Sequence, residues 1–160
     1  MLVLNPSGPQ HTPKRFNLFF SHRDILPVTL EVWGKPGDSR DENCQFSIGS
    51  DIPGEYDLGI AICGSVLSLE HVERMVNSTA AVPPNRWSRV ATVFTGTESR
   101  LYLICKFVAT APGSKLEGEA PFVIEIAGLS NLIVFYRGEI RPLQIWQGER
   151  YSSSFKSQPS

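Results

Sequence analysis

The side chains of this sequence that could catalyse a reaction or bind a metal are scattered, and their spacing brings no set of them together. The three histidines, His11, His22 and His71, have no partner at the spacing of a metal site or of a base and nucleophile pair. The sequence has no glycine-rich phosphate loop and no serine in a G-x-S-x-G turn. We therefore predict that the protein is not an enzyme and that it uses no metal and no cofactor.

Acidic residues form two small groups in loop-like segments. Glu117 and Glu119 flank a glycine, but a glycosidase needs two carboxylates that converge at a cleft, and we expect these two to be solvated loop charges. Asp38, Asp41 and Glu42 form a second group. This group resembles a calcium-binding loop of the C2 type, but the sequence has no matching aspartates in a second loop. Neither group predicts a site.

Composition narrows the class of protein. The chain has 160 residues, which is the size of one domain, and only 19% of them are charged. Low surface charge favours a subunit that buries surface against neighbours. The net charge of −1 gives no strong attraction to nucleic acid or membranes. The three cysteines, Cys44, Cys63 and Cys105, are predicted to be buried free thiols in a reducing compartment, and we expect no signal peptide and no membrane span.

Runs of β-branched and aromatic residues predict an all-β fold. About eight strands are expected, at 16–20, 27–33, 44–48, 56–63, 86–94, 100–110, 121–127 and 131–137, with a last short edge strand at 140–146. Residues 101–108 are apolar on most of both faces, which is typical of an interior strand. In 27–33, Val28, Leu30 and Val32 are expected to face inward and Thr29 and Glu31 outward.

The expected fold is therefore an eight-stranded antiparallel jelly-roll sandwich with one short helix and flexible arms at both ends. The helix is expected at 68–76, because Ser68 is a capping residue and Leu69, Val72 and Val76 share a helical face. The expected parts are an extended N-terminal arm at 1–15, the jelly-roll domain at 16–147 and a flexible tail at 148–160.

Six apolar or aromatic residues are candidates for contacts with other subunits. Trp33, Trp87 and Trp146 each lie within or at the end of an expected strand, where they either pack in the sheet or anchor a subunit interface. Prolines and glycines separate the N-terminus from the first expected strand, so we predict that 1–14 stays out of its own core. It would lie along a neighbouring subunit or on the inner surface of the assembly, and the candidate contacts of this arm are Leu2, Val3 and Leu4.

Residues 100–112 (RLYLICKFVATAP) followed by 122–126 (FVIEI) resemble the last strands of coat-protein domains in plant picorna-like viruses, the comovirus, nepovirus and cheravirus group of the Secoviridae. The run Phe135, Tyr136, Arg137 and Gly138 is similar to the Phe-Tyr-Gly-Arg element near the end of nepovirus coat proteins, with Arg and Gly transposed. The resemblance covers about the last third of the chain.

This resemblance implies a structural coat protein of an icosahedral plant virus, most similar to a single-jelly-roll cheravirus subunit. It implies other coat-protein subunits as partners, weak non-specific contact with genomic single-stranded RNA, and a place in the virion and in the host cytoplasm during assembly. Phe135, Tyr136 and Arg137 then join the interface candidates. The alternative is a lectin-like or C2-like β-sandwich that recognises sugar, peptide or lipid through loops such as 34–43 and 111–120. A β-sandwich hydrolase is a third and more distant interpretation.

Overall fold

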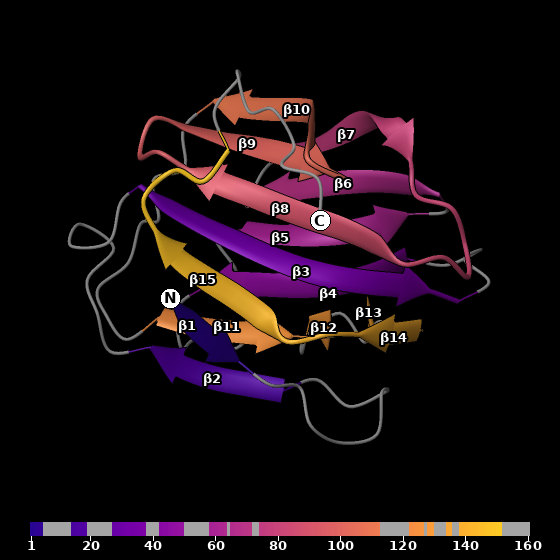
Figure 1. Cartoon of the computed structure of the whole chain (residues 1–160), viewed down its shortest axis with the longest axis horizontal. Helices are drawn as coiled ribbons and strands as arrows, with labels where there is room; N and C mark the ends of the chain where they lie inside the picture. Colours follow the sequence, from indigo (N-terminus) through magenta and orange to yellow (C-terminus); the bar gives the residue numbers. More distant parts are fainter. Residues whose placement is uncertain are drawn as a thin grey trace.

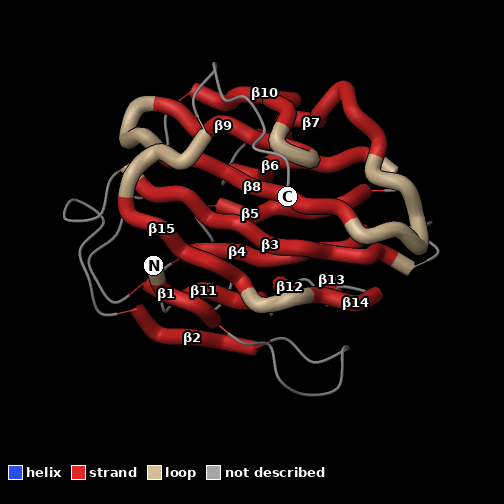
Figure 2. The backbone as a smooth tube through the Cα atoms, in the orientation of Figure 1, coloured by secondary structure: helices blue, strands red, loops and turns tan. Residues whose placement is uncertain are grey.

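Two antiparallel β-sheets lie one behind the other in the computed structural model (Figure 1). The structure describes residues 1–4, 14–18, 27–37, 42–49, 58–63, 65–71, 74–112, 122–126, 128–129, 134–135 and 138–151. These residues form strands and loops, and no helix is found among them (Figure 2). The predicted all-β sandwich is therefore confirmed.

The front sheet in Figure 1 has seven strands in the order β1-β15-β3-β8-β9-β10, and β14 also pairs with β3. Its strands are β1 (Leu2–Leu4), β3 (Val28–Pro36), β8 (Ser88–Phe94), β9 (Glu98–Leu103), β10 (Lys106–Pro112), β14 (Gly138–Ile140) and β15 (Leu143–Gln147).

The back sheet has six strands in the order β2-β11-β4-β5-β6-β7. Its strands are β2 (Lys14–Leu18), β4 (Glu42–Gly49), β5 (Leu58–Cys63), β6 (Val66–His71), β7 (Arg74–Ala81) and β11 (Phe122–Ile126). A separate pair is formed by β12 (Gly128–Leu129) and β13 (Val134–Phe135). The described residues thus form more strands than the eight predicted.

The hydrophobic core lies between the two sheets. Val28, Leu30 and Val32 of β3 are buried in one cluster with Ile60 of β5 and Leu69 of β6. Alternate residues of a strand point to opposite faces, so the apolar residues at every second position of β3 share this inner face. The inward assignment of Val28, Leu30 and Val32 is confirmed.

The predicted helix at 68–76 is wrong, because this segment belongs to the antiparallel pair β6 and β7. Leu67 and Leu69 are fully buried, and their spacing of two fits one face of a strand. Between them, the Ser68 hydroxyl donates a hydrogen bond to Asn77 Oδ1 across the pair at 2.8 Å. Pairing with β5 on the other side gives β6 a backbone partner on both edges, which an isolated short helix would not have.

The predicted interior strand at 101–108 is two strands joined by a tight turn. Leu103 pairs with Lys106, and the two residues between them have left-handed backbones, with φ of 49° at Ile104 and 62° at Cys105. Two consecutive positive φ angles define a hairpin turn whose twist matches that of the flanking strands. Of these two strands, β9 lies inside the front sheet and β10 forms its edge. A continuous apolar run therefore concealed a turn without glycine, asparagine or proline.

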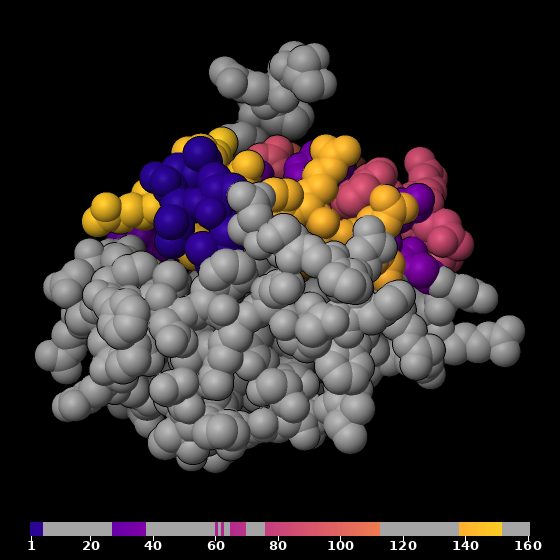
Figure 3. Space-filling view, turned by 90° about the horizontal axis from the view of Figure 1, so that it is seen from below, coloured from indigo at the N-terminus to yellow at the C-terminus, as the bar shows by residue number. Residues whose placement is uncertain are grey.

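Both ends of the described chain pack on the front sheet, contrary to the predictions of a detached arm and a tail that is flexible from residue 148. Strand β1 pairs with β15, and Leu4 is only 7% exposed within the core cluster. Strand β15 is consequently not an edge strand. Figure 3 shows β1 at the surface beside residues of the C-terminal part of the chain. Because β1 ends before Pro6, proline does not interrupt its pairing.

Candidate functional site

The face of the front sheet that points away from the core carries an unusual set of aromatic and charged side chains. Glu31 is paired with Gln144 on one side and Ala91 on the other, and Ala91 is paired with Tyr102. Paired residues point to the same face of a sheet, so this register places the set across four strands. We call it the outer face, and its residues are Thr29, Glu31, Trp33, Arg89, Ala91, Val93, Arg100, Tyr102, Gln144 and Trp146.

The centre of the outer face is a buried ionic group. Glu31 is only 3% exposed, and its Oε1 accepts a hydrogen bond from Arg89 Nη2 at 2.6 Å. The Tyr151 hydroxyl donates to the other carboxylate oxygen of Glu31, and the Arg89 guanidinium lies 5.8 Å from the centre of the Tyr151 ring. A buried carboxylate is stable only when such partners compensate for its lost hydration. This group is therefore a fixed part of the fold.

The same group shifts the protonation of its members. Burial raises the pKa of Tyr151, and the hydrogen bond to the Glu31 carboxylate raises it further. Burial alone would lower the pKa of Arg89, but the hydrogen bond and the charge of Glu31 outweigh it, so this pKa is raised. Tyr151 is thus a neutral donor and Arg89 a cation over the whole physiological pH range.

The segment 148–151 is held on the outer face by its backbone as well as by Tyr151. The Thr29 hydroxyl donates to the carbonyl oxygen of Gly148 at 2.8 Å, and the Tyr102 hydroxyl donates to that of Tyr151 at 3.0 Å. The rings of Tyr102 and Tyr151 have centres 5.0 Å apart. This segment explains why Thr29 and Glu31, which point outward as predicted, are nevertheless buried.

Two tryptophans and an arginine form a cluster beside this centre. The Arg141 guanidinium carbon lies 5.9 Å from the ring centre of Trp33 and 4.7 Å from that of Trp87. The backbone fixes the group, because Arg141 N–H donates to the carbonyl oxygen of Trp33 at 2.9 Å. Trp33 is 37% exposed, and Arg141 is also exposed. We call these three residues the Trp33/Trp87/Arg141 cluster, and it offers an aromatic surface and a cation to solvent.

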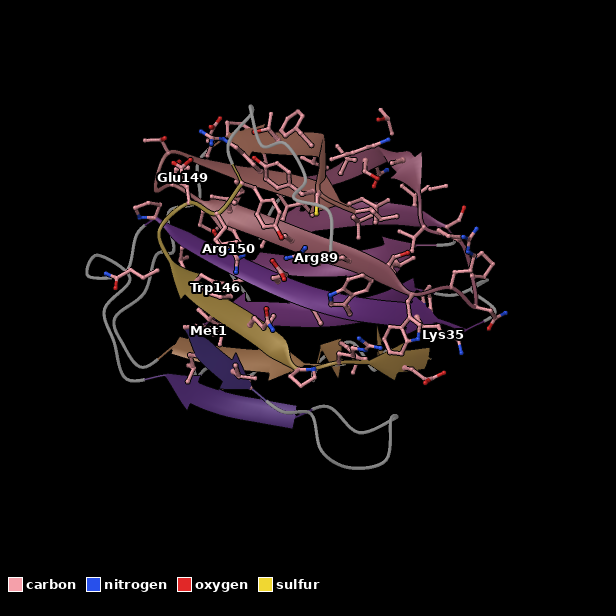
Figure 4. The ribbon with its side chains drawn as sticks, in the orientation of Figure 1. Met1, Lys35, Arg89, Trp146, Glu149 and Arg150 are labelled. Carbon is pink, nitrogen blue, oxygen red and sulfur yellow. The ribbon has the colours of Figure 1, made fainter. Side chains whose placement is uncertain are left out.

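A second stack lies on β15 and the segment that follows it. The Arg150 guanidinium carbon is 3.8 Å from the ring centre of Trp146, and Figure 4 shows the two side chains next to each other on the front of the sheet. The Trp146 indole N–H is buried and has no hydrogen-bond partner within the part of the chain that the structure describes. Both stacks are cation–π contacts, which are strongest for arginine over tryptophan.

The interface candidates have different positions in the fold. Trp33, Trp87 and Trp146 all lie in the two stacks of the front sheet. In β1, Leu2 and Val3 are exposed while Leu4 is in the core, so only the first two are accessible. Phe135 lies in β13, and Tyr136 and Arg137 lie outside the described residues.

Sequence reasoning missed five residues of the ionic group and of the two stacks: Glu31 as an ion-pair partner, Arg89, Arg141, Arg150 and Tyr151. One signal was available, since Thr29, Glu31 and Trp33 occupy alternate positions of a clear strand pattern and must share a face. No feature of the neighbouring sequence identified the arginines as members of a site, because arginine is common on protein surfaces.

The other sequence candidates do not form a site in the described residues. His71 lies in β6, whereas His11 and His22 lie outside the described part, as do Glu117 and Glu119. Within that part, no three metal-binding side chains gather and no helix is long and apolar enough to cross a membrane. Cys105 is a free thiol but is half-buried rather than buried as predicted, and the side chains of Cys44 and Cys63 lie outside the described part. The acidic group near β4 has only the backbone of Glu42 described.

No protein-family model and no curated protein matches the chain. Solved structures do. The heptameric SAP-like pentraxin of Limulus polyphemus has a TM-score of 0.65 at 15% identity, over 91% of this chain and 74% of that one. The CBM40 domain of the Ruminococcus gnavus IT-sialidase, bound to α2,3-sialyllactose, has a TM-score of 0.64 at 13% identity, over 86% of this chain and 88% of that one.

A third neighbour is domain 4 of AbnA, a GH43 extracellular arabinanase from Geobacillus stearothermophilus, in complex with arabinotriose. Its TM-score is 0.57 at 14% identity, over 76% of this chain and 61% of that domain. Identities this low establish the jelly-roll-like β-sandwich fold and nothing finer. None of these three neighbours is a viral coat protein. The coat-protein interpretation and the alternative of a binding module both stay predictions.

Proposed function

We propose that this protein is a non-enzymatic β-sandwich module that binds saccharides on the outer face of its front sheet. The proposal is based on the Trp33/Trp87/Arg141 cluster, where exposed indole surface and an exposed guanidinium come together on a β-sheet. Two structural neighbours of similar fold hold oligosaccharides, the CBM40 domain and the arabinanase domain, and this supports the proposal by analogy of fold.

The chemistry of the cluster suits a sugar. A pyranose ring has an apolar face of C–H groups and an edge of hydroxyls, so it needs a flat apolar surface with hydrogen-bond donors beside it. Trp33 supplies the surface, and Arg141 supplies donors in a fixed fork. Ligand sites combine aromatic lining with a few placed polar groups in this way. The ring positions are held by β3 and by the start of β8 and need no rearrangement before binding.

Tryptophan and arginine also dominate the energetics of protein interfaces, so a contact with another subunit is the competing use of the same cluster. The two uses differ in outcome. A saccharide site binds small sugars as a monomer, whereas a coat subunit assembles with partner chains. The proposal that the protein is a binding module therefore predicts that it remains monomeric when it binds its ligand.

A glycan array followed by calorimetric titration of the best glycan tests the proposal. Trp33→Ala is expected to weaken binding about tenfold or more, because it removes the exposed aromatic surface. Phe107→Ala is the matched control, since Phe107 is also an exposed aromatic ring but lies on the edge strand β10. Equal affinity of Trp33→Ala and wild type, or no binding to any glycan together with assembly into particles, would refute the proposal.

A further inference from the structure

Three of the described cations on the front sheet have a carboxylate partner. Lys35 pairs with Glu139 at 2.7 Å, and Arg89 pairs with buried Glu31. Arg100 pairs with Glu149 at 2.9 Å and also with Glu98. Their charges are therefore compensated within the fold and are not available to a ligand.

Arg141 differs from these cations. In the described part of the chain its guanidinium contacts two indole rings and no carboxylate. The nearest acid along the chain, Glu139, is held by Lys35. Arg150 also stacks on an indole without an acid partner, but it follows Glu149, whose carboxylate adds negative charge at that end of the sheet. Arg141 is therefore a cation of the cluster that no carboxylate of the described residues compensates.

An arginine held on aromatic rings is well suited to bind an anion. The rings contact the guanidinium and help to order it, while its N–H donors match the two oxygens of a carboxylate and are accessible because Arg141 is exposed. Less side-chain freedom is lost on binding, because the stack already orders the side chain. A neutral hydroxyl has one acceptor oxygen, so it can accept hydrogen bonds from only some of the guanidinium N–H groups that a carboxylate would bind.

From this we infer that the saccharide recognised at the Trp33/Trp87/Arg141 cluster carries a carboxylate, and that Arg141 binds this group while the indole of Trp33 packs against the sugar ring. The inference rests on the proposed function and specifies its ligand as an acidic saccharide, such as a hexuronic or sialic acid. Two observations support the inference. The Arg141 guanidinium contacts the two indole rings at 5.9 and 4.7 Å, and it has no acid partner within the described residues.

Two pairs of sugars that differ by an acidic group test this inference: methyl β-D-glucuronide against methyl β-D-glucoside, and 3′-sialyllactose against lactose. The dissociation constants are measured by titration calorimetry for the wild type, Arg141→Gln, Arg141→Lys and Lys106→Gln. Lys106→Gln is the charge-matched control, because Lys106 is an exposed cation on the far edge strand β10. The wild type is expected to prefer the acidic member of at least one pair about tenfold or more.

The variants separate a specific contact from general attraction. Arg141→Gln should abolish the preference, because it weakens the affinity for the acidic sugar about tenfold more than that for the neutral one. Arg141→Lys should retain part of the preference, and Lys106→Gln should retain all of it. Equal binding of acidic and neutral sugars overturns the inference but leaves the proposed function standing. An equal loss in Arg141→Gln and Lys106→Gln overturns it in favour of non-specific charge attraction. No binding of any of the four sugars, combined with no glycan binding on the array, overturns both.

Discussion

Removing the Tyr151 hydroxyl should destabilise the protein even though Tyr151 lies beyond the last strand. Its hydroxyl donates to the buried Glu31 carboxylate, and Tyr151→Phe leaves that carboxylate with Arg89 as its remaining side-chain partner among the described residues. A hydrogen bond to a charged group contributes about 1.5–3 kcal/mol. For a chain of this size, that loss lowers the melting temperature by about 3–12 °C. Tyr151→Ala should cost more, because the ring itself is buried against Tyr102.

The assay is urea unfolding followed by circular dichroism, with the midpoint and slope fitted for each variant. Glu149→Gln is the control, because Glu149 lies two residues before Tyr151 and this variant removes only a surface ion pair with Arg100. The loss of that pair should cost less than about 1 kcal/mol. If Tyr151→Phe unfolds at the wild-type midpoint, or shifts no more than Glu149→Gln, then the segment 148–151 does not stabilise the sheet and the reasoning is wrong.

Three further predictions concern the chain end, the tight turn and alkaline pH. Leu4→Ala should cost about 2–5 kcal/mol in urea unfolding, whereas Leu2→Ala should cost little, because Leu4 is in the core and Leu2 is 41% exposed; equal costs would mean that β1 does not join the fold. Ile104→Asn should stabilise the protein by about 1 kcal/mol, because asparagine tolerates the left-handed backbone better and Ile104 is 56% exposed; a lower melting temperature would contradict this. Burial and Glu31 raise the pKa of Tyr151 above its ordinary value of 10.0, so the folded state holds this proton more tightly than the unfolded state does. The free energy of unfolding should therefore fall as pH rises above about 10, and it should fall less in Tyr151→Phe. Parallel pH profiles of the two proteins would rule this out.

The sandwich could be predicted from the sequence because its strongest signals are local. Val28, Leu30 and Val32 alternate with polar residues, and alternation identifies both a strand and its inner face. The hairpin of β6 and β7 could not be distinguished from a helix in this way. Leu69 and Val76 fit one helical face, yet in the fold they are paired across two strands. Pairing between strands depends on partners, which a short window of sequence does not contain.

The outer face was only partly predictable for the same reason. The alternation of Thr29, Glu31 and Trp33 places these three residues on one face, but the contact of Trp33 and Trp87 with Arg141 depends on the register of β3 and β8, which places Trp33 opposite Arg89. The burial of Thr29 and Glu31 depends on residues near the other end of the chain. Arg141 gains its significance from an absent acid partner within the described residues, and no single-position property of the sequence shows this.

The pairing of the earliest and latest strands has a consequence for how the protein is made. Thr29 binds Gly148 across 119 residues of sequence, and β1 pairs with β15. During synthesis at about 5–20 residues per second, β3 therefore waits about 6–24 s for β15 to leave the ribosome. Throughout that interval one edge of a central strand is open to pairing with other nascent chains. Contacts of such long sequence separation also make folding slow, so soluble yield should depend on translation speed and on chaperones that cover this edge.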